Sequence, residues 1–527
     1  MNLVSGFLNS ARRFPDRPTL EIENDVFTYA QLAKKVPRIQ NAILKYSEAL
    51  GHSPFICILA HRSLTIYAGI LGILAAGKGY VPLNPKFPIE RNQTMLLASK
   101  TRVLVVGNEC QNLLSAFLKE IKDPLVILFP GSNDEGNLTA SFPMHHFIFS
   151  DQMAEIRSDL TTPEVSEDSF AYMVFTSGSS GTPKGVPITH RNAASYVSAV
   201  SGDYNEHDRF SQCYDMTFDA SMGDLFIAWQ CGACVVCIPE HSVMAPAKII
   251  RDKRLTHWDS VPSVIVFLQK LRMLKPGIFP SLKMSVFGGE PLTSSLAEAW
   301  QQAAPNSIIE NQYGPTETTN ATLRYRWNKN TPRTFSKNDY VPIGYPFPGQ
   351  SVCLIDKDFQ VLTKGETGEL CISGSQVSLG YWNNPEKTDQ QFVALPEFGK
   401  QIWYRTGDLC YQDEHGCFYF LGRIDEQVKI RGYRVELQEI ESVLRKISRS
   451  EQAVAIAWPI TNGSAEGVIA FLACENKNSE NEILDGCRKV LPEFMVPRKI
   501  HFLDQMPLNT SGKIDRRSLV QFLEASK

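Results

Sequence analysis

A short stretch rich in glycine, serine and threonine carries the clearest chemical signal in the sequence. It reads Tyr172-Met-Val-Phe-Thr-Ser-Gly-Ser-Ser-Gly-Thr-Pro-Lys-Gly-Val186, an apolar strand end followed by hydroxyls, glycines and one cation. Glycines let the main chain approach a ligand closely, and successive N–H groups and hydroxyls form a concave anion site. The stretch therefore predicts a polyphosphate-binding loop, although it lacks the G-x-x-x-x-G-K-[ST] spacing. Its binding residues would be Thr176, Ser177, Gly178, Ser179, Ser180, Gly181, Thr182 and Lys184.

Further motifs place aromatic, acidic and basic side chains beside tight turns. They are Asn311-Gln-Tyr-Gly-Pro-Thr-Glu-Thr-Thr319, Tyr404-Arg-Thr-Gly-Asp-Leu409, Gly422-Arg-Ile-Asp425, Lys429-Ile-Arg-Gly-Tyr-Arg-Val-Glu436 and Pro507-Leu-Asn-Thr-Ser-Gly-Lys-Ile-Asp515. An aromatic face suits a nucleobase, and a carboxylate suits a hard cation. Taken singly, each motif could also be a structural turn, a surface salt bridge or a plain hairpin.

In this order and over nearly the whole chain, the motifs resemble the adenylate-forming superfamily: acyl-CoA synthetases, luciferases and nonribosomal peptide synthetase adenylation domains. The resemblance implies that Tyr313 stacks on adenine and that Asn311 bonds its exocyclic amine. It also implies that Thr316 contacts phosphate and Glu317 holds Mg²⁺. Asp408 would bind the ribose diol, and Arg423 would contact the nucleotide. Gly289, Gln312 and Gly314 complete the nucleotide-binding positions.

The C-terminal motifs imply a change of conformation between two half-reactions. By resemblance, Asp425 is the hinge, and Gly432 lines a tunnel for phosphopantetheine, where a side chain would obstruct. Lys513 would be the catalytic lysine, a cation that neutralises charge between the substrate carboxylate and the α-phosphate. Lys184 and Glu317 are the other predicted catalytic residues.

Phe218-Asp219 bears on the class of acid that is activated. In members of the superfamily that activate amino acids, an aspartate at this position pairs with the α-ammonium group. A buried ammonium needs such a partner, because an unpaired buried charge is very costly. The alternative is that Asp219 caps a helix beginning at Ala220, since Phe-Asp-Ala-Ser also fits an N-cap. We favour the amino-acid interpretation.

The side-chain pocket is assigned by carrying the family's positions onto this sequence. Two glycines are expected to leave space, and Ser260, Gln312 and Asn320 to offer polar contacts to a medium or large side chain. The assigned residues are Phe218, Asp219, Ala220, Gly223, Ser260, Val286, Gly288, Gln312, Asn320 and Ala321, with Lys513 at the carboxylate. They match no particular amino acid.

Together these features predict an ATP- and Mg²⁺-dependent ligase that forms aminoacyl-AMP and pyrophosphate, then loads the phosphopantetheine thiol of a carrier protein. The chain ends at residue 527, 14 residues after Lys513, so we expect a freestanding enzyme with a carrier protein in trans. The alternatives are an acyl- or aryl-CoA ligase, a D-alanine–carrier-protein ligase and a non-catalytic nucleotide-binding relative.

Composition sets outer bounds on the function. The net charge of −3 argues against a nucleic-acid partner, and no apolar run is long enough to span a bilayer. With 12 cysteines and no signal peptide, we expect free thiols and a cytoplasmic enzyme without a membrane partner. Cys231-x-x-Cys234 has zinc-site spacing, but Cys234-Val-Val-Cys237 reads as a strand, so we predict buried structural thiols.

Strands that alternate with helices through residue 340 predict an α/β fold with doubly wound sheets, whose ligands bind at the carboxyl ends of the strands. Residues 131–143 read as a polar surface loop. Beyond residue 340, short glycine-rich strands predict a small antiparallel or barrel-like subdomain. We expect a large N-terminal domain over 1–424, with the ATP and amino acid sites, and a small mobile α+β domain over 425–527.

Overall fold

The computed structural model describes residues 2–47, 53–133, 136–154, 164–178, 183–328, 339–425, 427–450, 452–461, 463–473, 479–508 and 514–526. The chain divides into two compact units. Unit 1 contains residues 1–85, 95–175 and 185–424, and unit 2 contains residues 86–94, 176–184 and 425–527. Two segments of the N-terminal part therefore group with the C-terminal residues, which the sequence did not indicate.

One sheet of unit 1 has seven strands in the order β7-β6-β5-β3-β4-β8-β9. The pairs from β7 through β8 are parallel. Parallel strands need helical crossovers, and α4 packs on β3 and β4 as the sequence pattern predicted. The strands are β3 (Phe55–Leu59), β4 (Gly79–Leu83), β5 (Val103–Val106), β6 (Val126–Leu128), β7 (His146–Ile148), β8 (Phe170–Thr176) and β9 (Lys184–Thr189).

A nine-stranded sheet has the order β16-β15-β14-β13-β12-β10-β11-β1-β2. Its inner strands from β14 to β1 are parallel, whereas β15, β16 and β2 are antiparallel, so the sheet is mixed. The strands are β1 (Pro18–Ile22), β2 (Asp25–Thr28), β10 (Arg209–Gln212), β11 (Cys234–Cys237), β12 (His257–Ser260), β13 (Met284–Gly288), β14 (Ile308–Tyr313), β15 (Leu323–Trp327) and β16 (Tyr345–Pro346).

Both faces of this sheet are covered by apolar side chains, as strand β11 demonstrates. Val235 and Cys237 belong to one core and Cys234 and Val236 to another, so successive side chains enter different cores. Because side chains alternate across a strand, the two cores lie on opposite faces of the sheet. We call them the first core, which includes Phe210 and Tyr196, and the second core, which includes Trp258 and Phe287.

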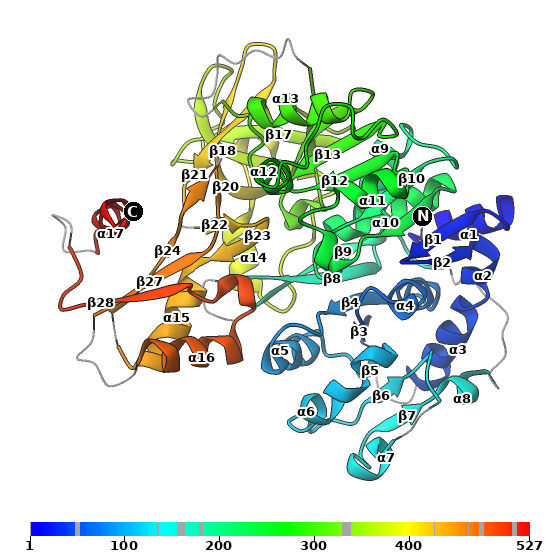
Figure 1. Cartoon of the computed structure of the whole chain (residues 1–527). Coiled ribbons are helices and arrows are strands. Elements are labelled where there is room, and N and C mark those ends of the chain that lie inside the picture. Colours follow the sequence, from blue (N-terminus) through cyan, green and yellow to red (C-terminus); the bar gives the residue numbers. More distant parts are fainter. Residues whose placement is uncertain are drawn as a thin grey trace. The chain divides into compact units, whose positions relative to one another are not determined.

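The third sheet of unit 1 is antiparallel, as predicted for the residues beyond 340. It contains β17 (Gln350–Ile355), β18 (Thr367–Gly374), β19 (Phe392–Ala394), β20 (Ile402–Gln412) and β21 (Phe418–Arg423). The last of these strands pairs with β20 and ends just before unit 2. Figure 1 shows β17, β18, β20 and β21 running side by side.

Helices account for most of the connections in the N-terminal part of the chain. Residues 29–47 form two helices, α2 and α3, and the residues that were expected to form a polar surface loop contain the short helix α7. The helices are α1 (Ser5–Arg13), α2 (Tyr29–Ala33), α3 (Val36–Ser47), α4 (Leu64–Ala75), α5 (Ile89–Ser99), α6 (Leu114–Leu118), α7 (Leu138–Ser141), α8 (Ser150–Ala154), α9 (His190–Ser201), α10 (Ala220–Cys231), α11 (Ala247–Asp252), α12 (Ser263–Lys270), α13 (Ser294–Ala303) and α14 (Pro385–Gln391). The 3₁₀ turns include η2 (Asn108–Leu113) and η4 (Thr316–Thr318).

The C-terminal residues of unit 2 form an α+β arrangement with their own apolar core. Strands β24, β27 and β28 make one sheet, and β22, β23, β25 and β26 make another. The elements are β22 (Gln427–Ile430), β23 (Tyr433–Glu436), α15 (Leu437–Ser448), β24 (Gln452–Ala457), β25 (Ile460–Thr461), β26 (Ser464–Ala465), β27 (Val468–Ala473), α16 (Glu480–Val490), β28 (Lys499–Leu503) and α17 (Arg516–Ala525). The predicted α/β fold with a large N-terminal and a small C-terminal part is confirmed.

Among the described residues, no helix combines the length and the apolar character needed to cross a bilayer.

Candidate functional site

Three of the predicted nucleotide-binding side chains meet at the carboxyl end of β14. The hydroxyl of Tyr313 donates a hydrogen bond to Asp408, and the guanidinium of Arg423 lies 2.6 Å from the other carboxylate oxygen. Asp408 and Arg423 stand opposite one another on β20 and β21. The antiparallel register therefore sets the Asp408–Arg423 pair, while β14 brings in the aromatic ring from another sheet. An aromatic face beside a carboxylate–guanidinium pair suits a nucleoside.

Asn311 lies on β14, two residues before Tyr313. Its side-chain amide nitrogen donates to the main-chain oxygens of Pro342 at 2.9 Å and Val341 at 3.3 Å. These two bonds use the donor hydrogens and fix the orientation of the amide. The carbonyl oxygen is then the group that Asn311 can offer to a ligand, and an exocyclic amine is a matching donor.

The turn after β14 has an unusual main-chain conformation. Thr319 and Asn320 both have positive φ, 61° and 65°, and a β-branched residue rarely adopts this region. The side chain of Gln376, which is fully buried, donates to the main-chain oxygen of Ala321 at 2.6 Å, and Thr319 Oγ1 donates to the main-chain oxygen of Gln376. Such strain persists where the surroundings hold it, and it gathers at binding sites.

Gly314 at the same turn has no room for a side chain. A Cβ atom there would lie 2.5 Å from the main-chain oxygen of Asn320. The Tyr-Gly-Pro sequence thus serves close main-chain packing, in addition to presenting Tyr313.

Asp219 immediately precedes α10 but does not cap it. Its main chain is already helical, with φ −64° and ψ −25°, and its side chain makes no capping bond. Instead, Asp219 Oδ2 accepts a hydrogen bond from the main-chain N–H of Asn320 at 3.0 Å. The helix-cap alternative is therefore wrong, and the carboxylate is directed toward the strained turn after β14.

The other pocket positions of α10 lie on its first turns, beside the same segment. A Cβ atom on Gly223 would come within 2.7 Å of Asn320 Nδ2 and 3.4 Å of the Tyr196 ring. The space that we expected Gly223 to leave is thus occupied by Asn320 and Tyr196. Phe218 and Ala220 are half-buried, and Ala321 joins the first core.

The register of the sheet decides which of the predicted pocket residues share a face. Strands β13 and β14 pair Gly288 with Gln312, and β12 and β13 pair Ser260 with Phe287. Paired residues of parallel strands project on the same face, and Phe287 belongs to the second core. Ser260 therefore lies on the face opposite to Gly288 and Gln312.

The hydrogen bonds of Ser260 agree with this placement. Its hydroxyl accepts from the indole N–H of Trp258 at 2.9 Å, and Trp258 is a second-core residue. Ser260 thus does not share a face with Gly288 and Gln312, whereas its neighbour Asp259 does, and the assignment of Ser260 to the substrate pocket stays a prediction.

Glu317, the predicted Mg²⁺ ligand, is completely buried in η4. The hydroxyl of Tyr381 donates to its Oε1 at 2.8 Å. Among the described residues, no group of three or more histidine, cysteine, aspartate or glutamate side chains could hold a metal. One carboxylate fits Mg²⁺ in a nucleotide site, because this ion takes one or two carboxylates together with phosphate oxygens and water.

The predicted phosphate loop is described only in part. Ser179, Ser180, Gly181 and Thr182 lie outside the described residues, as does the predicted catalytic Lys513. Thr176 ends β8 and Lys184 begins β9. Within unit 2, Ser177 Oγ donates to the main-chain oxygen of Arg434 at 3.0 Å, and Lys184 Nζ lies 3.9 Å from Glu436.

The predicted hinge and tunnel residues lie near the start of the C-terminal segment of unit 2. Asp425 is its first residue after Ile424 and accepts a hydrogen bond from the main-chain N–H of Gln427 at 3.1 Å. Arg431 and Gly432 connect β22 and β23 with positive φ at both positions, 51° and 85°. A two-residue hairpin turn of this kind favours glycine. The turn conformation alone therefore explains why residue 432 is a glycine, independently of the predicted tunnel.

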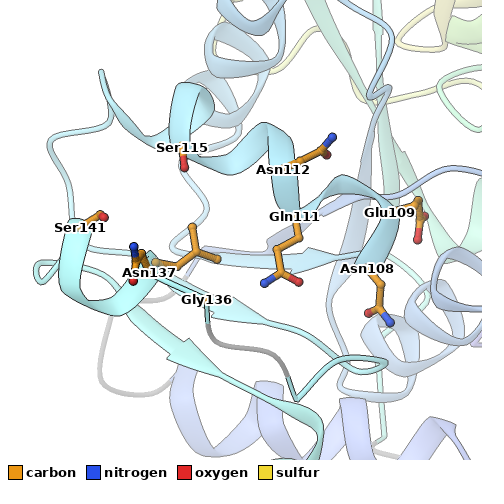
Figure 2. A pocket seen from close by; sticks show the side chains of 9 residues that line it. Asn108, Glu109, Gln111, Asn112, Ser115, Gly136, Asn137 and Ser141 are labelled. Carbon is orange, nitrogen blue, oxygen red and sulfur yellow. The ribbon is translucent and has the colours of Figure 1, made fainter.

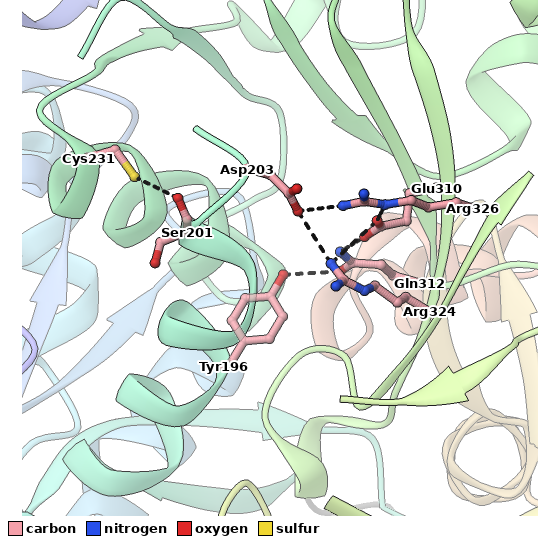
Figure 3. Close-up of polar contacts among 8 residues, drawn as sticks. All are labelled: Tyr196, Ser201, Asp203, Cys231, Glu310, Gln312, Arg324 and Arg326. Carbon is pink, nitrogen blue, oxygen red and sulfur yellow. Dashed lines mark hydrogen bonds and ion pairs between the residues drawn. The ribbon is translucent and has the colours of Figure 1, made fainter. Parts of the chain in front are cut away.

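The cysteine motif is not a metal site in the described structure. Cys234 and Cys237 are buried on opposite faces of β11, as predicted, but Cys231 is only half-buried. Burial raises the pKa of Cys231 and of Cys234 to about 12, so both remain thiols at neutral pH. Figure 3 shows Cys231 donating to the main-chain oxygen of Ser201.

A cavity of about 430 Å³ lies away from all of these residues, between η2, α6 and α7 (Figure 2). Its lining is mostly amide and hydroxyl groups. The one acid that lines it, Glu109, already accepts from the main-chain N–H of His61 and the hydroxyl of Ser63. This cavity contains none of the predicted site residues.

Several residues of the site carry no signal in the sequence. Tyr196, Gln376 and Tyr381 come from segments far from the motifs and reach the site only through tertiary structure. Asp259 is next to Ser260, which the sequence analysis assigned to the pocket. Side chains alternate along a strand, so the apolar Trp258 could have indicated that Asp259 projects on the other face.

Comparison with known proteins shows which family the chain belongs to. A family model described as AMP-binding enzyme matches residues 7–382, and one described as AMP-binding enzyme C-terminal domain matches residues 439–513. The chain belongs to the AMP-binding enzyme family. Within this family it is an adenylation enzyme of the nonribosomal-peptide-synthetase type, as its relatives indicate.

Two curated relatives of this AMP-binding enzyme illustrate the likeness. It is 31% identical over 520 residues to tyrocidine synthase 3 of Brevibacillus parabrevis, covering 98% of this chain and 7% of the relative. It is 30% identical over 521 residues to gramicidin S synthase 1 of Brevibacillus brevis, covering 97% and 44%. The chain thus spans less than half the length of these relatives.

A solved structure matches over almost its whole length. The Vibrio cholerae adenylation domain AlmE, crystallised with glycyl-adenosine-5′-phosphate, is 30% identical and superposes with a TM-score of 0.88, covering 100% of this chain and 98% of AlmE. The structure of IdnL7 is also 30% identical, with a TM-score of 0.72 and coverage of 100% and 99%.

Proposed function

We propose that this chain activates an α-amino acid as aminoacyl-AMP and then passes the aminoacyl group to the phosphopantetheine thiol of a carrier protein. The observation that carries the amino-acid part is the orientation of Asp219. Its carboxylate leaves the helix end and points toward Asn320, where an α-ammonium group could reach it. An ammonium taken out of water needs this kind of partner. The glycyl-adenylate in the AlmE structure supports the same substrate class.

In the first step, a substrate carboxylate oxygen attacks the α-phosphorus of ATP. The bond between that phosphorus and the bridging oxygen breaks, and pyrophosphate leaves with the electron pair. Tyr313, Asp408 and Arg423 would hold the nucleoside, and Asn311 would accept from the adenine amine. Because the bound reactants are already held in position, the loss of their translational and rotational entropy does not add to the barrier of the chemical step.

Cationic groups and Mg²⁺ would act on the phosphates. Lys184 and the loop that it follows would hold the leaving pyrophosphate, and Lys513 would neutralise charge between the carboxylate and the α-phosphate. Glu317 would hold Mg²⁺, which supplies charge neutralisation to the phosphate oxygens when bound.

In the second step, the thiol of a carrier-protein phosphopantetheine attacks the aminoacyl carbonyl. The thiol loses its proton, a thioester forms, and AMP leaves. We propose that rotation at Asp425 separates the two steps and that the hairpin around Gly432 lies beside the pantetheine arm in the second. A carrier that is a separate protein, acting in trans, belongs to the same proposal.

Pyrophosphate exchange into ATP tests the first step directly. We expect exchange driven by at least one amino acid and not by fatty or aromatic acids. Comparing D- with L-amino acids separates a D-alanine–carrier-protein ligase from the main proposal. Lys513→Ala should lower aminoacyl-AMP formation at least about 100-fold, on the scale of a removed transition-state contact. Exchange with acids that lack an amino group, at the rate of amino acids, would contradict the function of Asp219.

A further inference from the structure

The face of the nine-stranded sheet that carries the proposed substrate pocket also carries an acidic residue. Asp259 on β12 pairs with Val286 on β13, and Val286 pairs with Glu310 on β14. Because paired residues in parallel strands project on the same side, Asp259 shares a face with Val286, Gly288 and Gln312. This observation rests on the proposed function, since that function makes the face a substrate pocket.

The polar groups of β14 on this face are already engaged with one another (Figure 3). Gln312 accepts from the hydroxyl of Tyr196 at 3.1 Å and donates to Glu310 at 2.7 Å. Glu310 in turn lies 3.0 Å from Arg326 and 3.6 Å from Arg324. Both ends of the Gln312 amide are therefore committed, and the charge of Glu310 is neutralised within the protein.

Asp259 differs from Glu310 in the partners that the structure describes for it. It is 8% exposed, and the hydroxyl of Tyr214 donates to its Oδ1 at 3.0 Å. Across the part of the chain that the structure describes, no lysine or arginine forms an ion pair with Asp259. Burial raises the pKa of its carboxyl to about 7.

A second buried carboxyl group, that of Asp224, is influenced by the charge of Asp259. Asp224, 1% exposed on α10, accepts from the main-chain N–H of Cys213 through Oδ2, whereas its Oδ1 has no hydrogen-bond partner in the described structure. Burial and then the charge of Asp259 raise the pKa of Asp224 well above the ordinary value. Arg62 is the cation that acts on Asp224, and it is hydrogen-bonded to main-chain oxygens of Cys213 and Ile238.

A carboxyl group that is buried beside a neutral donor is costly to ionise, which is why burial raises the pKa of Asp259. A protein normally pairs a buried charge, because an isolated one is strongly unfavourable. A bound ligand that carries a positive group would supply the missing partner. The α-ammonium is not that group, because the proposed function pairs it with Asp219.

We propose that the substrate is an α-amino acid with a cationic side chain, and that Asp259 pairs with its terminal charge. Val286 and the small Gly288, on the next strand, would lie along the aliphatic part of the side chain. A linear ω-amino acid such as lysine or ornithine combines such a stem with a terminal ammonium.

The test is pyrophosphate exchange with lysine, ornithine, arginine, norleucine, glutamine, leucine and glycine. Norleucine has a linear aliphatic side chain without the charge, so the lysine-to-norleucine ratio of kcat/KM measures the contribution of the cation. We expect a ratio of at least about 100 in the unaltered protein, on the scale of a buried charge pair.

Asp259→Asn keeps the shape of the side chain and removes its charge. The variant should lower the lysine-to-norleucine ratio at least about 10-fold, with norleucine activation retained or raised. Ser260→Ala is the matched control, because this neighbouring residue projects into the second core and should leave the ratio unchanged. Retained norleucine exchange also establishes that the Asn variant is folded.

The outcomes separate this inference from the proposed function. If neutral or acidic amino acids drive exchange and cationic ones do not, the inference is wrong while amino acid adenylation stands. If no amino acid drives exchange, the proposed function fails and the inference fails with it. An unchanged lysine preference in Asp259→Asn would also overturn the assignment of Asp259. If that variant does not fold, the lysine-to-norleucine ratio of kcat/KM in the unaltered protein decides whether the substrate side chain is cationic.

Discussion

At the scale of single residues, the two aspartates 219 and 259 divide the proposed recognition of the substrate between them. Asp219 sits at a helix start, yet it makes no capping contact and accepts from the Asn320 main chain. Asp259 is held by the neutral hydroxyl of Tyr214. A buried carboxylate that has only a neutral donor beside it, as Asp259 has, can take up a ligand's positive group, at a cost to the stability of the free protein.

Asp219→Asn should abolish most of the amino-acid activation. The substitution preserves size and leaves the α-ammonium without a counter-charge, so kcat/KM in pyrophosphate exchange should fall about 100-fold or more, in keeping with the loss of a partner from a desolvated ion pair. ATP binding, followed by fluorescence of a nucleotide analogue, should stay unchanged because Tyr313 and Asp408 are untouched. Exchange at the original rate would contradict the pairing.

Asp259 should also make stability depend on pH. Its folded pKa of about 7 lies above the ordinary value of 3.8, so between about pH 4 and pH 7 the native state holds a proton that the unfolded state has lost. Stability falls with rising pH wherever the native state binds more protons. Asp259→Asn removes this contribution. The melting temperature of the variant minus that of the original chain should therefore be larger at pH 8 than at pH 5. An equal difference at the two pH values would refute the raised pKa of Asp259.

At the scale of elements, the carboxyl end of β14 gathers the site. The strand supplies Asn311, Gln312 and Tyr313, and the strained turn that follows supplies the main-chain N–H that meets Asp219. Gln376 holds this turn with donated hydrogen bonds to three main-chain oxygens. The geometry of the substrate side therefore depends on a residue that is expected to touch neither nucleotide nor amino acid.

Gln376→Ala tests that dependence. Removing a buried donor leaves carbonyl oxygens without partners, which costs about 1–3 kcal/mol, and the positive-φ turn loses its support. We expect a lower melting temperature and a rise in the KM for amino acid that exceeds the rise for ATP. Gln360→Ala, at an exposed position, is the control and should change neither quantity. Equal effects on both KM values would show that Gln376 only supports the fold.

At the scale of the whole molecule, the chain passes between its two compact units at several points, and Ile424 and Asp425 mark the last of them. Two separate cores make rotation at this junction physically possible, because neither core needs to be broken. The proposed function uses such a rotation between its half-reactions.

Asp425→Pro should separate the two half-reactions. Proline fixes φ near −65° and limits rotation about the junction, so thioester formation should fall about 10-fold or more while pyrophosphate exchange changes little. Loading of pantetheine or of a carrier protein, measured by mass spectrometry, gives the second rate. Asp425→Ala, which keeps the main chain free, should load normally. If the proline variant also loads normally, the hinge lies elsewhere.

Much of the fold followed from periodicity and turn residues. The strands at 55–59, 79–83, 103–106 and 284–288 and the helix after the phosphate loop were predictable, because apolar runs bounded by glycine and proline specify local structure. The division of residues 29–47 into two helices and the short helix at 138–141 were not, since short elements depend on packing.

The family resemblance of its motifs let the sequence name Tyr313, Asp408 and Arg423 as candidate nucleotide-binding residues, and the tertiary structure brings these three side chains together. Only the tertiary structure decided which side chains share the face of the sheet that carries the proposed substrate pocket. Asp259 and Ser260 are neighbours in sequence, and a strand sends neighbouring side chains to opposite faces, so which one meets the substrate depends on sheet register. A local pattern carries residue type and spacing, whereas register and burial arise from contacts between strands distant in sequence.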